Sequence, residues 1–235
     1  DFRLMLHLIN DISNNHYRST TFNAKIERIL LFYSEFIKQK FNQKYLFNIF
    51  QNNKRLLHFL ITNGILKVDE RISYLITKKV WKDRKTYVSY FKENRNLATK
   101  YFENKKKTIK NYDYYFYPEI KPFIDEKSRT YIEKVLMKDD NFDLDEFNRK
   151  RRIGENESKI CELIRNDSIK EFVIYVTKNN IKLTSEIKES IFETNPLLLH
   201  PGVSLIEYAA FFGSIQIFQY LRLNNIELTS SLWKY

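Results

Sequence analysis

The sequence predicts an all-α fold in which pairs of antiparallel helices stack side by side as a solenoid. Three observations predict it. The 235 residues include only four glycines and four prolines, which favours long helices over a sheet-rich fold. Apolar side chains recur at spacings of three and four residues. The stretch from Ile160 to Lys178 also recurs, 46 residues later, from Ile206 to Asn224. One helix pair cannot bury its own apolar face, so this repetition predicts stacking.

The composition bounds the class of protein. Hydrophobic residues make up 43% of the chain and aromatic residues 16%, enough for a sizeable core. No run reaches the roughly 18 apolar residues that span a membrane. The single Cys161 excludes an intramolecular disulfide and fits a reducing compartment. We therefore expect a cytoplasmic location.

The first region, residues 1–110, is predicted to be helical. The expected helices cover residues 2–12, 22–41, 46–52, 55–62 and 70–80. Asp69 is predicted to cap the last of them. The pair within residues 45–68 is a faint copy of the later repeats, with Asn63-Gly64-Ile65 as its turn.

The most basic segment is residues 78–110. It holds twelve Lys and Arg against three acidic residues, a net +9 of the chain's +11, with aromatic residues interleaved. A helix with a solvated basic face accounts for this pattern. The alternative is a nucleic-acid-binding segment that uses phosphate contacts and base stacking, with Lys105, Lys106 and Lys107 as contact residues.

Residues 111–152 are predicted to connect two regions. The run from Tyr112 to Pro122 carries five aromatic residues, and Pro118 and Pro122 break a helix. A linking helix follows from Ser128 to Met137. The basic cluster from Arg149 to Arg152 is expected to be a solvated helix end; the alternative is a nuclear-import signal, which would allow a nuclear location.

The last region, residues 153–235, holds the clearest repeats. Gly213 is predicted to end a first helix in the left-handed conformation, and Ser214 to cap the second helix with its side-chain oxygen. Ser168 is its counterpart one repeat earlier. Ala209 and Ala210 are small where two helices approach, and Asn225 suits a left-handed turn. The segment 185–201 is predicted to be an enlarged loop.

The stretch from Gly202 to Thr229 resembles one ankyrin repeat. Gly202 and Gly213 stand at the two glycine positions, and Ala209-Ala210 at the small pair. Ser204 to Glu207 replace the family's Thr-Pro-Leu-His. With the segments 152–157 and 160–165, the chain is similar to the divergent N-terminal region of uncharacterised ankyrin-repeat proteins of parasitic protists. The resemblance implies a binding scaffold without catalysis, and we expect further repeats after Tyr235.

The resemblance also implies which residues bind a partner. In ankyrin repeats, variable positions flank the first glycine and end the first helix; carried over, these are His200, Pro201, Val203, Phe211 and Phe212. Phe211 and Phe212 are either interface anchors or packing residues. The implied partner is another protein. Cys161 lies inside a first helix and is expected to be a small buried side chain.

No pattern predicts an enzyme, a metal or a cofactor. The acidic run 139–143 starts like a calcium loop but has Leu144 and Lys150 where Gly and Glu are required. The four histidines are scattered, and no phosphate-binding loop is present. The glycosylation-type triplets 156–158 and 166–168 are interpreted as helix caps and turns.

Overall fold

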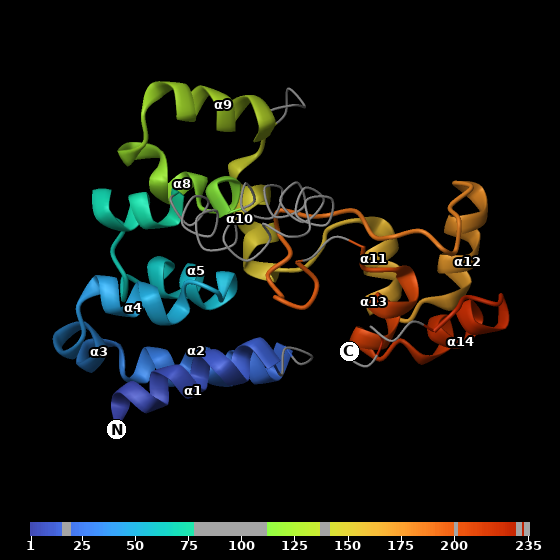
Figure 1. Cartoon of the computed structure of the whole chain (residues 1–235), viewed down its shortest axis with the longest axis horizontal. Coiled ribbons are helices and arrows are strands. Elements are labelled where there is room, and N and C mark those ends of the chain that lie inside the picture. Colours follow the sequence, from blue (N-terminus) through green and yellow to red (C-terminus); the bar gives the residue numbers. More distant parts are fainter. Residues whose placement is uncertain (16–19, 78–111, 137–141, 200–201, 229–231, 233–235) are drawn as a thin grey trace, which may run out of the picture. The chain divides into compact units, whose positions relative to one another are not determined.

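The computed structural model describes residues 1–15, 20–77, 112–136, 142–199, 202–228 and 232. These residues form helices and loops, which confirms the all-α prediction. An isolated antiparallel bridge between Glu186 and Ser204 is the one β-type pairing within these ranges. The chain divides into two compact units, Asp1–Ile153 and Gly154–Tyr235 (Figure 1).

The first unit contains the helices named here. They are α1 (Phe2–Asn15), α2 (Thr20–Phe32), α3 (Ser34–Lys40), α4 (Gln43–Phe50), α5 (Lys54–Thr62), α8 (Tyr117–Ile120), the 3-10 helix η1 (Lys121–Phe123), α9 (Glu126–Leu136) and α10 (Leu144–Ile153). Residues 70–77 and 112–115 are also helical. The basic segment 78–110, with its nucleic-acid alternative, lies outside the described residues.

Packing in the first unit begins with the early helices. α1 packs against α2 and α4, and α4 packs against α5. Local signals set the ends of these helices. The Asn53 side chain accepts a hydrogen bond from the backbone N–H of Leu56 at 2.9 Å and so caps α5. Gly64, in the turn after α5, has a left-handed backbone conformation with φ of 62°. Asp69 accepts from the N–H of Ile72 at 2.8 Å, which is the cap that the sequence predicts.

The single helix predicted over residues 22–41 is instead two helices, α2 and α3, joined at Tyr33. Tyr33 has φ of −94° and ψ of 10°, outside the helical range. The bend brings two aromatic rings onto Phe2 of α1: Tyr33 at 5.2 Å and Phe36 at 4.2 Å between ring centroids. Helical spacing alone does not reveal this break, because the contacts that hold it come from another helix.

The predicted connector is wrong for the aromatic run 112–117. Tyr112, Tyr114, Tyr115, Phe116 and Tyr117 are all buried, and the run belongs to the first unit. The helical turn 112–115 ends at Phe116, and Pro118 lies in the first turn of a new helix, α8, where no intrahelical N–H is needed. Large aromatic rings gain much by burial, so the run is packed into the core although the prolines interrupt its helices.

The expectation of a solvated cluster at Arg149–Arg152 is wrong for Arg151, whereas Arg149 and Arg152 are exposed. Arg151 in α10 is 4% exposed, and its guanidinium makes a two-pronged ion pair with Glu119 of α8, both N–O distances being 2.7 Å. It also donates to the Tyr115 carbonyl at 2.7 Å, and the Tyr115 hydroxyl donates back to the Arg151 carbonyl at 3.0 Å. Arg151 therefore ties α10 to the aromatic run and α8.

A second buried cation faces the same ring. Lys54 at the start of α5 is fully buried, and its ammonium lies 4.7 Å from the centroid of Tyr115 and 5.6 Å from that of Tyr112. Cation–ring attraction helps to offset the loss of hydration of such a charge. The aromatic run thus stabilises basic side chains from two different helices.

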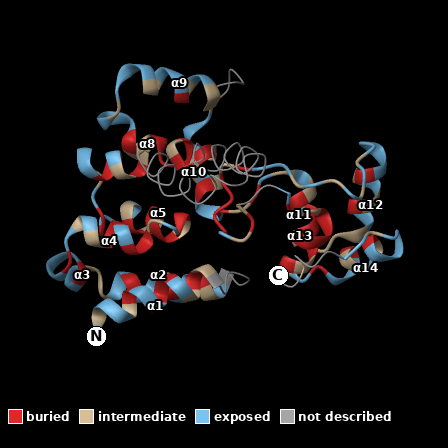
Figure 2. Cartoon of the chain, in the orientation of Figure 1, coloured by how far each residue is buried: buried red, intermediate tan, exposed pale blue. Residues whose placement is uncertain are grey.

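The second unit holds two helix pairs. The first pair is α11 (Lys159–Arg165) and α12 (Ile169–Lys178), and the second is α13 (Leu205–Phe212) and α14 (Ile215–Leu223). The pairs pack in parallel register, α11 against α13 and α12 against α14. α13 is buried along most of its length, whereas α12 and α14 expose one face (Figure 2).

Candidate functional site

The turns of the second unit repeat the same backbone geometry. Asp167 between α11 and α12 has φ of 48°, and Gly213 between α13 and α14 has φ of 68°. Asn180 and Asn225, which follow the second helices, have φ of 50° and 58°. All four turns are therefore left-handed, a conformation that Gly, Asn and Asp adopt most easily.

A carboxylate joins the two helix pairs. Asp167 accepts hydrogen bonds from the backbone N–H groups of Gln216 and Ile217, each at 3.0 Å. These donors lie in the first turn of α14, where N–H groups lack intrahelical partners and where negative charge is favoured. Asp167 of the first pair thus caps the second helix of the next pair.

The role predicted for Ser214 is therefore corrected. Ser214 precedes α14 but its side chain does not cap that helix. Its hydroxyl donates instead to the carbonyl of Ile164 in α11, and it is buried. Ser168, which precedes α12, likewise makes no side-chain cap. The sequence pattern predicts where α14 begins, but it does not predict which groups donate and accept the hydrogen bonds there.

The interface between the pairs is apolar. Cys161, Ala209 and other small or branched side chains are buried along α11 and α13, whereas Ala210 is half-buried. Phe172 of α12 and Tyr220 of α14 meet edge to face at 6.1 Å. Burial raises the pKa of the Cys161 thiol to about 11, so little thiolate forms at neutral pH.

The long loop between the pairs is fixed at both ends. At its base, the N–H of Ile187 donates to the Val203 carbonyl at 2.8 Å, next to the bridge between Glu186 and Ser204. At its far end, the buried Glu193 carboxylate accepts from the N–H of Asn195 at 2.9 Å and from that of Asn156 at 3.2 Å. The loop is thus built into the unit although no helix forms between residues 179 and 199.

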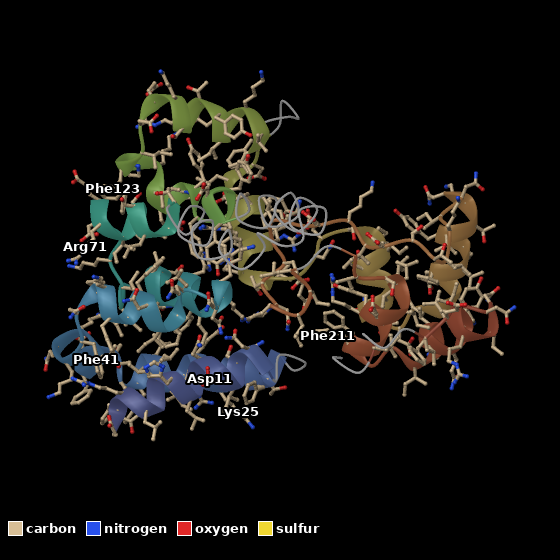
Figure 3. The ribbon with its side chains drawn as sticks, viewed as in Figure 1. Asp11, Lys25, Phe41, Arg71, Phe123 and Phe211 are labelled. Carbon is tan, nitrogen blue, oxygen red and sulfur yellow. The ribbon has the colours of Figure 1, made fainter. Side chains whose placement is uncertain are left out.

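The five residues expected to contact a partner do not lie on one exposed surface. Val203 and Phe211 are buried, 1% and 2% exposed (Phe211 is labelled in Figure 3). Phe212 is half-buried, with its ring 4.8 Å from that of Tyr208 and 4.9 Å from that of Phe211. His200 and Pro201 lie outside the described residues. Of the three placed residues, Phe212 alone offers a partly open side chain.

A charged network beside Phe212 was not foreseen from the sequence. The Arg165 guanidinium lies 2.8 Å from the Glu155 carboxylate and donates to the Tyr208 hydroxyl at 2.8 Å. It also lies 6.0 Å from the centre of the Phe212 ring. Nothing in the local pattern marks these residues, because Glu155, Arg165 and Tyr208 come together only when the pairs stack.

Within the described ranges, no three His, Cys, Asp or Glu side chains converge as they would around a metal ion. None of the helices in those ranges combines the length and apolar character that crossing a membrane requires. Comparison of the chain with family models, with curated proteins and with solved structures found no match.

Proposed function

We propose that this chain is a non-catalytic interaction module whose second unit is built from ankyrin-like helix pairs and binds a protein partner. The observation that carries the proposal is the stacking of two consecutive pairs in register, α11 on α13 and α12 on α14. The left-handed turns support it, since Asp167 and Gly213 stand 46 residues apart and Asn180 and Asn225 stand 45 apart. A solenoid of this kind presents an extended surface for recognition.

Two local features support the ankyrin-like interpretation further. Ser204 and Glu207 form a capping box at the start of α13, with the Ser204 N–H donating to the Glu207 carboxylate at 2.8 Å. Glu207 stands where the family has histidine, and its carboxylate accepts a hydrogen bond from the backbone at the start of α13. The isolated bridge between Glu186 and Ser204 also joins the loop to the start of the second pair.

Within this proposal, Phe212 is the anchor for the partner. It ends a first helix, it is half-buried, and its ring is supported by Tyr208 and by the Arg165 guanidinium. A partly open aromatic ring held in one orientation loses little entropy on binding, which is typical of interface hot spots. Phe211 is a core residue in the same proposal.

The test isolates the protein partner from the natural source cells by cross-linking and then measures binary binding with purified proteins. Phe212→Ala is expected to weaken binding by about tenfold or more, with an unchanged circular dichroism melting curve. The matched control is Leu223→Ala on α14, which removes a side chain that is 83% exposed and should leave the affinity unchanged.

Two results would count against the proposal. Equal affinities for the wild type and Phe212→Ala would remove the assigned anchor. Recovery of RNA or DNA in place of a protein, with affinity that falls steeply as salt rises, would favour the nucleic-acid alternative.

A further inference from the structure

The first unit contains a hollow of about 690 Å³ between helix 70–77 and the segment 123–132. Arg71 and Phe123, labelled in Figure 3, belong to its two sides. Its volume falls in the range typical of sites for small ligands or single side chains. The described residues that line it include Glu70, Arg71, Tyr74, Asp113, Phe123 and Asp125.

The described part of the lining is acidic although the chain is basic. Among the described residues that line the hollow, Glu70, Asp113 and Asp125 accompany one cation, Arg71, in a protein whose net charge is +11. A concave surface with one sign of charge concentrates ligands of the opposite sign. Tyr74 and Phe123 add aromatic rings, which attract cations through their faces.

The three carboxylates are not equivalent. Asp125 has a structural role: it accepts from the N–H of Ser128 at 2.9 Å and from its hydroxyl at 2.8 Å, at the start of α9. Glu70 lies exposed at the start of helix 70–77. Asp113 differs from both, because its Oδ1 is buried and accepts no hydrogen bond from the described part of the chain.

A buried carboxyl oxygen without a hydrogen bond destabilises a fold, and each one in a native protein calls for an explanation. Burial accordingly raises the pKa of Asp113 to about 7. A ligand that pairs with this group would remove the penalty. The orphan carboxyl, the acidic lining and the aromatic sides therefore all favour the same class of ligand.

We infer that this hollow binds an alkylammonium or guanidinium group, with the Asp113 carboxylate as the partner of the cation and Tyr74 and Phe123 as aromatic sides. The site lies in the first unit and does not depend on the proposed function of the second. Two sources present such a group: an arginine or lysine side chain of a polypeptide, and a free polyamine. The chemistry is the same in both.

The experiment titrates the purified full chain with N-acetylarginine N-methylamide by calorimetry. The uncharged isostere N-acetylcitrulline N-methylamide is the control ligand. We expect the arginine probe to bind at least tenfold more tightly than the citrulline probe. Putrescine forms the third arm. Tighter binding of putrescine assigns the site to a free polyamine, whereas tighter binding of the arginine probe assigns it to the side chain of a polypeptide.

Variants locate the binding. Asp113→Asn should weaken binding of the cationic probe about tenfold or more, and Phe123→Ala should weaken it through loss of a ring. Arg71→Gln should have the opposite effect and strengthen binding, because it removes a positive charge from the lining. Glu171→Gln, an exposed substitution on α12, is the matched control and should change nothing.

Several results would overturn the inference. They are equal affinity for the arginine and citrulline probes, no detectable binding of any cationic probe, and unchanged binding by Asp113→Asn. If Asp113→Asn did not fold, unchanged binding by both Phe123→Ala and Arg71→Gln would be decisive in its place.

Discussion

Burial shifts the pKa of two titratable side chains of the first unit toward the uncharged form. The pKa of His58 falls to about 3, first because of burial and then because of the positive charges of Arg151, Arg152 and Arg55. The pKa of Asp113 rises to about 7 because of burial. Desolvation disfavours the charged form in both cases, and it moves an acid and a base in opposite directions.

The His58 shift predicts acid sensitivity. The pKa of His58 is lower in the folded chain than in the unfolded chain. The neutral side chain therefore contributes its full stability above pH 6.5, and this contribution is lost as the pH falls toward 3. The free energy of unfolding of the wild type, minus that of His58→Gln, should fall by up to about 1.4 kcal/mol per pH unit in this window. Urea denaturation followed by circular dichroism measures the difference. A difference that does not vary with pH would contradict the prediction.

The Asp113 shift has the opposite sign. Its folded pKa is above the unfolded value, so its contribution is fully present below pH 3.8 and is lost as the pH rises through about 7. Glu70, Arg71 and Asp125 line the same hollow; burial first, then Tyr131 and the charge of Asp113, raise the pKa of Tyr114.

Asp113→Asn should therefore stabilise the unligated chain at pH 8 by roughly 1–4 kcal/mol. The gain should vanish near pH 4, where both side chains are uncharged. Chemical denaturation at the two pH values checks this. Destabilisation at pH 8 would show that the fold itself uses the charge.

At the scale of elements, the helices are held together by charged side chains that cross between them. Asp167 caps α14 from the preceding helix pair, through two N–H donors at 3.0 Å. Arg151 ties α10 to α8 through Glu119. Both contacts satisfy groups that would otherwise be buried or unpaired, so both should matter more than surface ion pairs.

Removal of the cap should loosen the stack. We expect Asp167→Ala to destabilise the second unit by about 1–2 kcal/mol, because two N–H groups of α14 lose their acceptor. Asp167→Asn should have a smaller effect, since its amide oxygen retains one acceptor. Glu171→Ala on the exposed face of α12 is the control. Equal unfolding midpoints for Asp167→Ala and the control would contradict the role assigned to the cap.

Substitution of two arginines of α10, Arg151 and Arg149, should lower the stability by very different amounts. Arg151→Ala leaves the Glu119 carboxylate without its buried partner, and we expect a loss of about 3 kcal/mol or more. Arg149 pairs with Glu146 at 2.5 Å, but its side chain is 56% exposed. Arg149→Ala should leave the unfolding midpoint nearly unchanged, because water screens an exposed ion pair. Thermal and urea denaturation of both variants provide the comparison; similar losses would show that burial does not govern these pairs.

For the whole molecule, the division into Asp1–Ile153 and Gly154–Tyr235 contrasts with the predicted division into three regions. The sequence places a connector over 111–152, whereas Tyr115 and Phe116 of that segment are fully buried in the first unit. Prolines and basic clusters are local signals of exposure. Burial is decided by what packs on a segment, and here the aromatic rings and Arg151 find partners far away in the chain.

Local chemistry by itself determined the helical class, the left-handed turns at Gly64, Gly213 and Asn225, and the cap at Asp69. These features depend on a residue and its neighbours within one turn, so periodicity and side-chain type are sufficient to predict them.

Only the tertiary structure decided which apolar and charged groups are enclosed. Phe211 and Phe212 are adjacent and identical in type, yet one is core and the other half-open. Asp167 meets its donors about 50 residues later, and the Oδ1 of Asp113 accepts no hydrogen bond from the described residues, in a hollow lined from distant segments. Burial and pairing of this kind arise between elements, and no pattern along one helix contains them.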